Sequence, residues 1–444
     1  MTLYLYNTIS RSKETFQPLD KTHIRIYACG PTVYDSIHIG NARPLVVFDV
    51  LVRLLRHLYP HVTYVRNITD VDDKINQRAV ERGISIEDLC EATIEQFHRD
   101  AGEIKVLAPD VEPRATHHIA EMIAMIEMLI ASGYAYEAEG HVLFSVAAMP
   151  SYGQLSGRSI DEMIAGARVE VAPYKRDPAD FVLWKPSQQD QPGWQSPWGT
   201  GRPGWHIECS AMSARYLGEM FDIHAGGLDL IFPHHENEIA QSVCAHGSDT
   251  MARYWVHNGY VTVEGEKMSK SVGNFITVQD ALMEHRGEAV RYALLAAHYR
   301  APLDFSAKQL DQAQRNLDKL YRAIDGVCGP DTGPDSEFLH ALCDDMNTPL
   351  ALSRLHKLAS DAQQGNEKTA AILKSSAELV GLIQDENWFS ASIDETDEIS
   401  SLVAERDAAR ADRDFVRADR IRDLLTARNI RLLDGPDGTR WEQG

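Results

Sequence analysis

Two short segments, here called the phosphate segments, carry residue types that suit the binding of a triphosphate. His38-Ile39-Gly40-Asn41 lies between an expected strand and an expected helix, where free backbone N–H groups and a positive dipole end bind phosphate. Lys267-Met268-Ser269-Lys270-Ser271 places two lysines three residues apart in a loop, and lysine is a compact charge that suits phosphate. Each segment alone is weak evidence, because a surface turn and a solvated basic loop are the commoner explanations.

Residues that could hold a metal ion are scattered along the chain. The six cysteines form no Cys-x-x-Cys pair and no short disulfide framework, and each alone is most simply a core residue. His234 and Glu238 are four residues apart, which on a helix places both side chains on one face. Such a pair can bind a metal ion, but alone it is weak evidence for one.

The expected elements place the first phosphate segment inside an α/β unit. Residues 24–29 are expected to form a strand, 45–58 a helix and 62–65 a second strand. This order of elements is the building block of a parallel sheet covered by helices. A second α/β half is expected to start near residue 205, with a strand over 221–225.

The rest of the chain is expected to be mainly helical, apart from one insertion. Residues 115–132 are predicted to form one amphipathic helix, and about 233–245 another. Residues 150–204 are rich in Gly, Pro, Ser and Trp, which indicates an irregular insertion. Helical patterns resume beyond residue 305, and 326–334 is predicted to be a linker rich in Gly and Pro.

Composition narrows the class of protein. The chain has 444 residues, which predicts several domains, and its 44% of apolar and 25% of charged residues are typical of soluble proteins. No apolar run approaches the ~18 residues of a membrane span, and the start carries no apolar signal region, so we expect a cytoplasmic protein without a membrane partner. The net charge of −21 restricts any nucleic-acid binding to local patches.

Taken together, the phosphate segments resemble the paired signatures of class I aminoacyl-tRNA synthetases in order and separation. Asn41 stands where the name of the family's motif has a second histidine, and an amide can still donate to a phosphate or ribose oxygen. Longer blocks resemble the cysteinyl-tRNA synthetase branch, and the similarity runs almost from end to end. The blocks are YVRNITDVDDK at 64–74, GRPGWHIECS at 201–210 and FPHHENE at 232–238, with 114–119 and 434–436.

The resemblance implies a fold and a division of the chain. The fold is α/β, with a Rossmann-like parallel-sheet catalytic domain that contains an insertion, followed by an α-helical C-terminal tRNA-binding region. The expected segments are the first catalytic half at 1–110, the insertion at 111–200, the second half with the lysine loop at 201–305, a helical bundle at 306–390 and an anticodon-binding region at 391–444.

The resemblance also implies an activity. A cysteine–tRNA ligase activates L-cysteine with ATP and Mg²⁺ to cysteinyl-adenylate, releases pyrophosphate and transfers cysteine to the 3′ end of tRNA(Cys). The family is usually monomeric and holds one zinc ion per chain. The resemblance implies that His38, Asn41, Lys267 and Lys270 act in catalysis, and that ATP is bound by the same four residues with Gly30, Gly40 and Ser269. It implies that Thr69, Trp205 and Asp229 bind cysteine and that Cys29, Cys209, His234 and Glu238 bind zinc. The implied tRNA-binding residues are Arg410, Asp419, Asp434 and Trp441.

A zinc ion would serve the choice between cysteine and serine. A soft metal accepts a thiolate far better than an alkoxide, so a site that depends on that bond needs no editing domain. Cys209 is expected to precede a helical stretch, where a thiolate is stabilised. Because four protein ligands normally mark a closed structural zinc, either Glu238 is a weak or displaceable ligand or the zinc becomes five-coordinate.

The end of the chain gives a separate indication of RNA binding. Five arginines from Arg406 to Arg420 are spaced four, three, four and three residues apart, which on one helix places them on one face. A second stripe that includes Phe415 suits packing. Acidic residues are interleaved with these arginines, so a solvated helix with internal salt bridges explains the pattern as well as an RNA-binding face does. Trp441 could stack on an unpaired base.

Three other functions share some of these features. A cysteine ligase of the mycothiol pathway resembles the catalytic half and joins cysteine to an amino sugar, but it lacks the C-terminal region. A non-catalytic RNA-binding paralogue is disfavoured by the presence of His38, Lys267 and Lys270. A zinc hydrolase needs an activated water and a general base, and His-x-x-x-Glu outside the zincin pattern supplies no such set.

Overall fold

The structure is a computed structural model. The chain folds into two compact units, residues 1–383 and 384–444. The described residues are 1–158, 172–188, 191–263, 265–268, 274–325, 333–389, 393–411, 414–427, 430–435 and 438–443. No helix within these ranges is long and apolar enough to cross a membrane.

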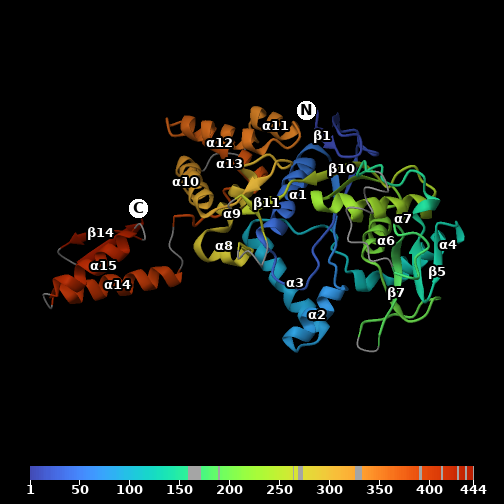
Figure 1. Ribbon diagram of the computed structural model, residues 1–444. Coiled ribbons are helices and arrows are strands. Elements are labelled where there is room, and N and C mark those ends of the chain that lie inside the picture. The colour runs from blue at the N-terminus through green and yellow to red at the C-terminus, as the bar shows by residue number, and fades with distance from the viewer. Residues whose placement is uncertain are drawn as a thin grey trace. The chain divides into compact units, whose positions relative to one another are not determined.

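A parallel four-stranded sheet forms the centre of the first unit (Figure 1), as the sequence predicted. Its order is β10-β9-β3-β4, and Ile26 lies opposite both Tyr64 of the next strand in the chain and Ile223 of the second half. The sheet therefore joins the two α/β halves side by side. Its strands are β3 (His23–Ala28), β4 (His61–Arg66), β9 (Phe221–Gly227) and β10 (Ala252–Asn258).

Helices on the sheet carry the residues of interest. Helix α1 (Ile39–Leu58) begins several residues earlier than predicted, because His38 acts as its N-cap. Helices α4 (Ile119–Ala131), α6 (Trp205–Leu217) and α7 (Glu236–His246) pack on one another and share one apolar core with the neighbouring strands. The first phosphate segment therefore lies at a helix N-terminus, as expected.

Three predicted boundaries change in detail. The helix predicted at 115–132 begins as a 3-10 turn, η1 (Ala115–His118), and continues as α4. The helix predicted from about 233 starts as α7 at Glu236, after the π-helical turn η4 (Ile231–His235). Cys209 was expected to precede a helix and instead lies inside α6, because Gly204 at the N-cap position starts that helix at Trp205.

The prediction that residues 150–204 are irregular is wrong in part. Two strands of this stretch complete an antiparallel sheet in the order β5-β6-β7-β8. Leu183 and Trp184 are fully buried in the core around α4, and Pro186 and Pro203 stand at strand ends, where a missing N–H is tolerated. The strands are β5 (Ala135–Ala138), β6 (His141–Phe144), β7 (Phe181–Pro186) and β8 (Gly201–Pro203).

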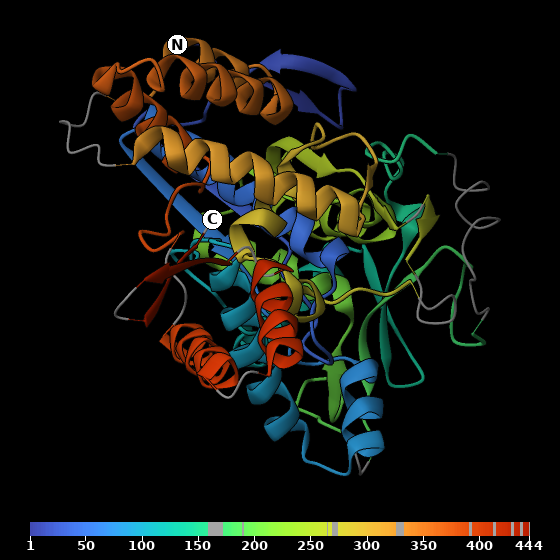
Figure 2. The same ribbon diagram turned by 90° about the vertical axis from the view of Figure 1, so that its left-hand side faces the viewer.

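A helical bundle ends the first unit (Figure 2). Leu310, Leu317 and Leu320 are buried along one face of α10, as their spacing predicted. The bundle comprises α10 (Ala307–Ile324), α11 (Ser336–Cys343), α12 (Thr348–Ala362) and α13 (Glu367–Leu379). Other elements of the unit are β1 (Tyr4–Asn7), β2 (Ser12–Thr15), α2 (Asp73–Arg82), α3 (Ile86–Glu103), η2 (Val146–Ala148), η3 (Leu228–Leu230), β11 (Val261–Val263), β12 (Glu266–Lys267), α8 (Val278–Glu284), α9 (Gly287–Leu295) and β13 (Leu303–Asp304).

A buried guanidinium ties this bundle to helix α1. Arg291 of α9 pairs with Asp49 of α1, and its Nε donates to the carbonyl oxygen of Val380 at 2.7 Å. Its Nη1 donates to the carbonyl oxygen of Lys105 at 3.0 Å. A Cβ at Gly381 would lie 2.5 Å from the guanidinium carbon, so this position must stay without a side chain. The contacts join α1, α9 and the end of α13.

In its described residues, the second unit contains two helices and a hairpin around a small core. They are α14 (Ile393–Ala411), α15 (Phe415–Ala427), β14 (Ile430–Gly435) and β15 (Gly438–Gln443). Val403 and Leu425 are among the buried residues where the helices meet. The hairpin pairs Leu432 with Trp441, and both side chains pack against that core.

The prediction of one helix with five arginines on one face is wrong. The backbone N–H of Arg417 donates to Asp414 Oδ1 at 3.1 Å, so Asp414 caps a new helix and divides the arginines between α14 and α15. Phe415, expected to pack, is 61% exposed at the start of that helix. Arg413 lies outside the described residues.

Candidate metal and nucleotide site

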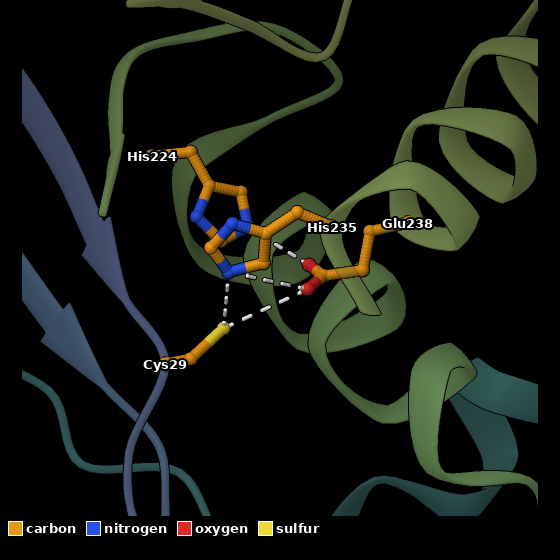
Figure 3. Close-up of side chains that lie close together, drawn as sticks. All are labelled: Cys29, His224, His235 and Glu238. Carbon is orange, nitrogen blue, oxygen red and sulfur yellow. Dashed lines mark hydrogen bonds and ion pairs between the residues drawn. The ribbon is translucent and has the colours of Figure 1, made fainter. Parts of the chain in front are cut away.

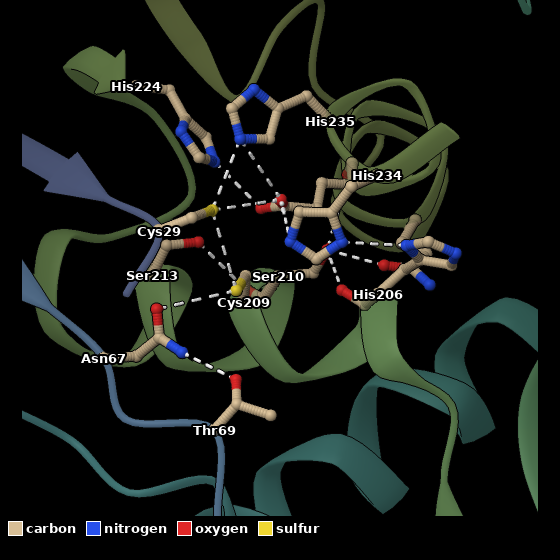
Figure 4. A network of polar contacts seen from close by, with 12 residues as sticks. Cys29, Asn67, Thr69, His206, Cys209, Ser210, Ser213, His224, His234 and His235 are labelled. Atoms are coloured by element: carbon tan, nitrogen blue, oxygen red, sulfur yellow. Dashed lines mark hydrogen bonds and ion pairs between the residues drawn. The ribbon is translucent and has the colours of Figure 1, made fainter. Parts of the chain in front are cut away.

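Four side chains with metal-binding atoms meet at the ends of the central strands. Cys29 follows β3, Cys209 comes from α6, and His234 and Glu238 come from η4 and α7. Their ligand atoms all lie within 4.8 Å of one another, and we call these four residues the metal cluster. The two sulfur atoms are 3.8 Å apart, and His234 Nε2 lies 3.1 Å from Glu238 Oε1. The structure therefore brings together all four residues that the resemblance implied. Figure 4 labels three of them, Cys29, Cys209 and His234.

A second set of possible ligands overlaps the first. His224 of β9 and His235 of η4 join Cys29 and Glu238 within the same 4.8 Å limit (Figure 3). His235 Nε2 lies 3.3 Å from the sulfur of Cys29, and His224 Nε2 lies 2.8 Å from Glu238 Oε2. Glu238 is thus in contact with imidazoles on both of its oxygens.

The electrostatics of the metal cluster favour a bound cation. Burial, with the neighbouring thiol and carboxylate, raises the pKa of Cys29 well above its ordinary value. The contact with Cys29 lowers the pKa of Cys209, but burial and Glu238 raise it by more, so the net shift is upward. A divalent cation would reverse these shifts, because metal coordination deprotonates thiols. The four donors therefore form a set whose ionised forms a bound cation would stabilise.

An outer layer of side chains fixes the orientation of the ligands. His206 Nδ1 lies 2.9 Å from His234 Nδ1, which leaves Nε2 of His234 directed at Glu238. Trp205 stacks on the His234 ring with centroids 4.2 Å apart. Burial lowers the pKa of His206 to about 3 and that of His234 well below its ordinary value, so both rings are neutral near pH 7. Neutral imidazoles of defined tautomer are the form that binds metals.

A chain of hydrogen bonds leads away from the metal cluster through His235. His235 Nδ1 lies 2.8 Å from His257 Nε2, and His257 Nδ1 lies 2.7 Å from the hydroxyl of Thr8. Sequence reasoning missed the outer histidines His206, His224, His235 and His257. Their partners lie far apart in the chain, and the only available signal was the density of histidines in the 232–238 block.

Two of the three expected cysteine-binding residues lie beside the metal cluster. Thr69 is buried and accepts a 3.2 Å hydrogen bond from Asn67, whose Oδ1 in turn accepts from the Gly30 N–H at 2.9 Å. Trp205 is 40% exposed and covers His234. Asp229 differs, since it is exposed on η3, where its carboxylate folds back over Gly227.

The two phosphate segments meet in the structure. A Cβ at Gly40 would lie 2.8 Å from the His38 ring and 2.9 Å from Met268 Cε, so the side chain of the second segment comes close to the backbone of the first. The N–H of Ile39 donates to the carbonyl oxygen of Ile276 at 3.0 Å, and the His38 ring contacts Phe275 edge-on. The stretch that follows the second segment is thereby attached to the start of α1.

His38 and Asn41 form a reciprocal cap at the start of α1. His38 Nδ1 accepts from the Asn41 N–H, and Asn41 Oδ1 accepts from the His38 N–H, each at 3.3 Å. Since Nδ1 is the acceptor, Nε2 carries the proton of the neutral ring and can donate to an anion. The side chain of Lys267 and the whole of Ser269 and Lys270 lie outside the described residues.

Gly30 is held against the neighbouring strand. A Cβ there would lie 1.6 Å from the carbonyl oxygen of Asn67, so only glycine fits. The expected ATP-binding role of Gly30 therefore has a competing structural explanation, namely the close approach of two strand ends.

The expected tRNA-binding residues all belong to the second unit. Arg410 of α14 and Asp419 of α15 are exposed. Trp441 of β15 is partly buried against the small core, which reduces the ring surface available for stacking. Asp434 lies in β14, and its side chain is outside the described residues.

Comparisons with known proteins agree along the whole chain. Residues 15–315 match the family described as tRNA synthetases class I (C) catalytic domain, and residues 337–384 match the DALR domain. The cysteine–tRNA ligase of Rhodospirillum rubrum is 60% identical over 459 residues, covering 100% of both chains. That of Gluconobacter oxydans is 56% identical, covering 99% of this chain and 98% of its own.

Solved structures of other synthetases share the fold. Mycobacterium tuberculosis methionyl-tRNA synthetase in complex with methionyl-adenylate has a TM-score of 0.58 at 18% identity, covering 81% of this chain and 89% of its own. A putative arginyl-tRNA synthetase from Campylobacter jejuni has a TM-score of 0.52 at 16% identity, covering 83% and 94%. At such identities the likeness shows the fold alone.

Proposed function

This chain belongs to the cysteine–tRNA ligase family of class I aminoacyl-tRNA synthetases, and from this premise we propose which residues bind, orient and activate its substrates. Its function is the ATP-dependent ligation of cysteine to tRNA. The observation that carries the proposal is the metal cluster, whose thiols, of buried Cys209 and partly buried Cys29, lie 3.8 Å apart beside a buried carboxylate.

Cys29, Cys209, His234 and Glu238 are proposed to hold one zinc ion. Two thiolates, an imidazole and a carboxylate form a set that zinc prefers, whereas the overlapping set with His224 and His235 has only one sulfur. When bound, the zinc supplies a soft Lewis acid that accepts the thiolate of substrate cysteine and rejects the hydroxyl of serine. Glu238 already contacts imidazoles on both oxygens, which supports a displaceable role for it.

Thr69, Trp205 and Asp229 are proposed to shape the cysteine pocket. Thr69 supports this role because it lies beside Asn67, which contacts Cys209, and Trp205 supports it because it stacks on His234 of the metal cluster. Asp229 would pair with the substrate ammonium group. Its place on η3, which directly follows β9, beside Gly227, supports a role at the rim of the pocket.

The activation step is proposed to depend on positive charge and hydrogen-bond donors around ATP. The cysteine carboxylate oxygen attacks the α-phosphorus, the bond to the bridging oxygen breaks, and pyrophosphate leaves. His38, Asn41, Lys267 and Lys270 stabilise the charge that develops, together with Mg²⁺, and Gly30, Gly40 and Ser269 line the nucleotide site. The contact between Gly40 and Met268 supports this arrangement, because it brings the two phosphate segments together.

The transfer step follows on the same surface. A terminal ribose hydroxyl of tRNA(Cys) attacks the adenylate carbonyl, the hydroxyl proton is released, and AMP leaves with its bonding electron pair. Proximity and orientation supply most of the rate, so no side-chain nucleophile is required.

The remaining proposals concern the second unit and the state of the enzyme. Arg410, Asp419, Asp434 and Trp441 are proposed to contact the anticodon end of tRNA, in a region that starts near residue 391. The exposure of Arg410 and Asp419 supports this. We also propose a monomer that works in the cytoplasm, where its tRNA is charged. The mycothiol-type alternative is not favoured, because cysteine–tRNA ligases match the full length of the chain.

The decisive test is ATP–pyrophosphate exchange with cysteine and with serine, each measured with and without a strong zinc chelator. We expect exchange with cysteine alone, lost with the chelator and restored by added zinc. Exchange that continues in the zinc-free enzyme would refute the metal assignment. No exchange from folded, zinc-loaded protein would refute the catalytic assignment and favour a non-catalytic paralogue.

A further inference from the structure

The side-chain amide of Asn67 lies between the metal cluster and the proposed cysteine pocket. Asn67 follows β4 and is 1% exposed. Its Oδ1 accepts from the Gly30 N–H at 2.9 Å. The same Oδ1 lies 3.7 Å from the sulfur of Cys209, and Nδ2 donates to Thr69 Oγ1 at 3.2 Å (Figure 4). One buried side chain therefore joins a strand end, a proposed zinc ligand and a proposed substrate-binding residue.

The orientation of this amide is fixed by its partners. The Gly30 N–H can only donate, so the amide oxygen must face it, and the amide nitrogen must then face Thr69. Because Nδ2 can only donate, Thr69 Oγ1 is the acceptor, and its own hydroxyl hydrogen points away from Asn67. Asn67 therefore determines the direction in which the Thr69 hydroxyl can donate.

The backbone of Thr69 is held by other contacts. Its N–H donates to the carbonyl oxygen of Pro31 at 3.1 Å, and its carbonyl oxygen accepts from the Val33 N–H at 3.1 Å. These two bonds fix where Thr69 lies, but they do not fix the direction of its hydroxyl hydrogen. A change in the amide of Asn67 can therefore alter that direction while the backbone of Thr69 stays in place.

We propose that Asn67 is a positioning residue for cysteine recognition, which sets the direction of the Thr69 hydroxyl relative to the metal cluster. This proposal rests on the proposed function, because that function assigns Thr69 to the cysteine pocket. The contact with Cys209 keeps the amide beside the cluster, so the hydroxyl and the proposed zinc ligand have a defined spacing. A carboxylate in place of the amide would still accept from Gly30 but would offer no donor to Thr69.

Asn67→Asp tests the proposal with a side chain of nearly the same shape. The change replaces the donor by an acceptor, so the Thr69 hydroxyl must turn round to donate to residue 67. Thr69→Val removes the hydroxyl itself. Asn7→Asp is the matched control outside the metal cluster, because buried Asn7 also donates to a carbonyl oxygen, at 3.1 Å, and accepts from a backbone N–H, at 3.0 Å. Asn67→Ala, which deletes the amide, avoids placing a carboxylate near Cys209.

The decisive measurement is the dissociation constant of cysteine from the zinc-loaded protein, measured by calorimetry beside the kinetics of pyrophosphate exchange. We expect this constant and the KM for cysteine to rise about tenfold in Asn67→Asp and Asn67→Ala, as for one lost hydrogen bond. The kcat, the KM for ATP and the zinc content should stay unchanged. Thr69→Val should show a rise of similar size, and the double variants should bind no more weakly than the weaker single variant. Asn7→Asp should keep its cysteine affinity even if its thermal unfolding midpoint falls.

Other outcomes would overturn the proposal. Unchanged cysteine binding in both Asn67 variants would show that the amide does not serve recognition. Effects that multiply in the double variants would show that Asn67 does not act through Thr69. Loss of zinc from both Asn67 variants would show that the residue supports the metal cluster instead. Failure of the proposed function is a distinct result, namely no exchange by zinc-loaded wild-type protein, and the binding measurement tests Asn67 even then.

Discussion

The metal cluster and the phosphate segments are built in opposite ways. The cluster takes Cys29, Cys209 and the pair His234 and Glu238 from separate stretches of the chain, and all but the partly buried Cys29 are closed into the interior. Each phosphate segment is one contiguous stretch, and the first lies at the surface, with Asn41 exposed. One proposed site is completed by the fold, while the other is proposed to be completed by a bound nucleotide.

This difference predicts different consequences of mutation. In a buried cluster, each donor depends on its neighbours, so a lost ligand changes metal binding as well as activity. At an exposed phosphate site, a lost charge removes an interaction with the transition state and leaves the fold intact. Variants of the metal cluster should therefore lose zinc, whereas variants of the phosphate segments should keep it.

The largest effect is expected for Cys209→Ala. Loss of one of two sulfur ligands should abolish zinc binding and reduce cysteine-dependent pyrophosphate exchange by about 10³-fold or more, since selection rests on the metal–thiolate bond. Zinc content by mass spectrometry, measured beside exchange, checks this. Cys343→Ala is the matched control, because Cys343 is buried in α11 outside the metal cluster. A Cys209→Ala enzyme that keeps its zinc would contradict the ligand assignment.

A smaller effect is expected for Lys270→Ala. Removal of one phosphate-binding charge should lower pyrophosphate exchange by about 10²-fold. Zinc content and the thermal unfolding midpoint should equal those of the wild-type protein. Lys308→Ala, at an exposed position of α10, should leave all three quantities unchanged. If Lys270→Ala lost zinc as well, the two sites would not be independent and the comparison would fail.

The smallest effect is expected for His206→Ala. His206 contacts His234 rather than the metal position, so its removal should weaken zinc binding by about tenfold without abolishing it. Competition against a chelator of known affinity measures the change, with exposed His117→Ala as the control. An unchanged zinc affinity would show that Trp205 alone orients the His234 ring.

The sequence predicted well those features that depend on neighbouring residues. The central strands, the helix after the first phosphate segment and the apolar face of α10 all follow from local periodicity, and the structure confirms them. The proposed metal ligands were different, because only His234 and Glu238 have a spacing that indicates a shared helix face. Cys29 and Cys209 were found through resemblance, since their contact spans 180 residues of chain.

Two errors have the same physical origin. The arginine spacing continues at a helical period from α14 into α15, so the pattern hides the break that Asp414 creates by capping a new helix. In the insertion, the abundance of Gly, Pro and Trp hides a strand in which Leu183 and Trp184 are buried against α4. In both places a specific tertiary or capping contact overrides the average character of the stretch.

The position of Arg291 has a consequence for dissecting this protein into fragments. A fragment that ends at residue 315, where the catalytic family match ends, would lack the Val380 carbonyl that accepts from Arg291. It would also lack Gly381, whose backbone lies against the Arg291 guanidinium, so water would reach the ion pair between Arg291 and Asp49. The boundary of homology is therefore not a boundary of folding, and the smallest autonomous catalytic fragment should extend through residue 383.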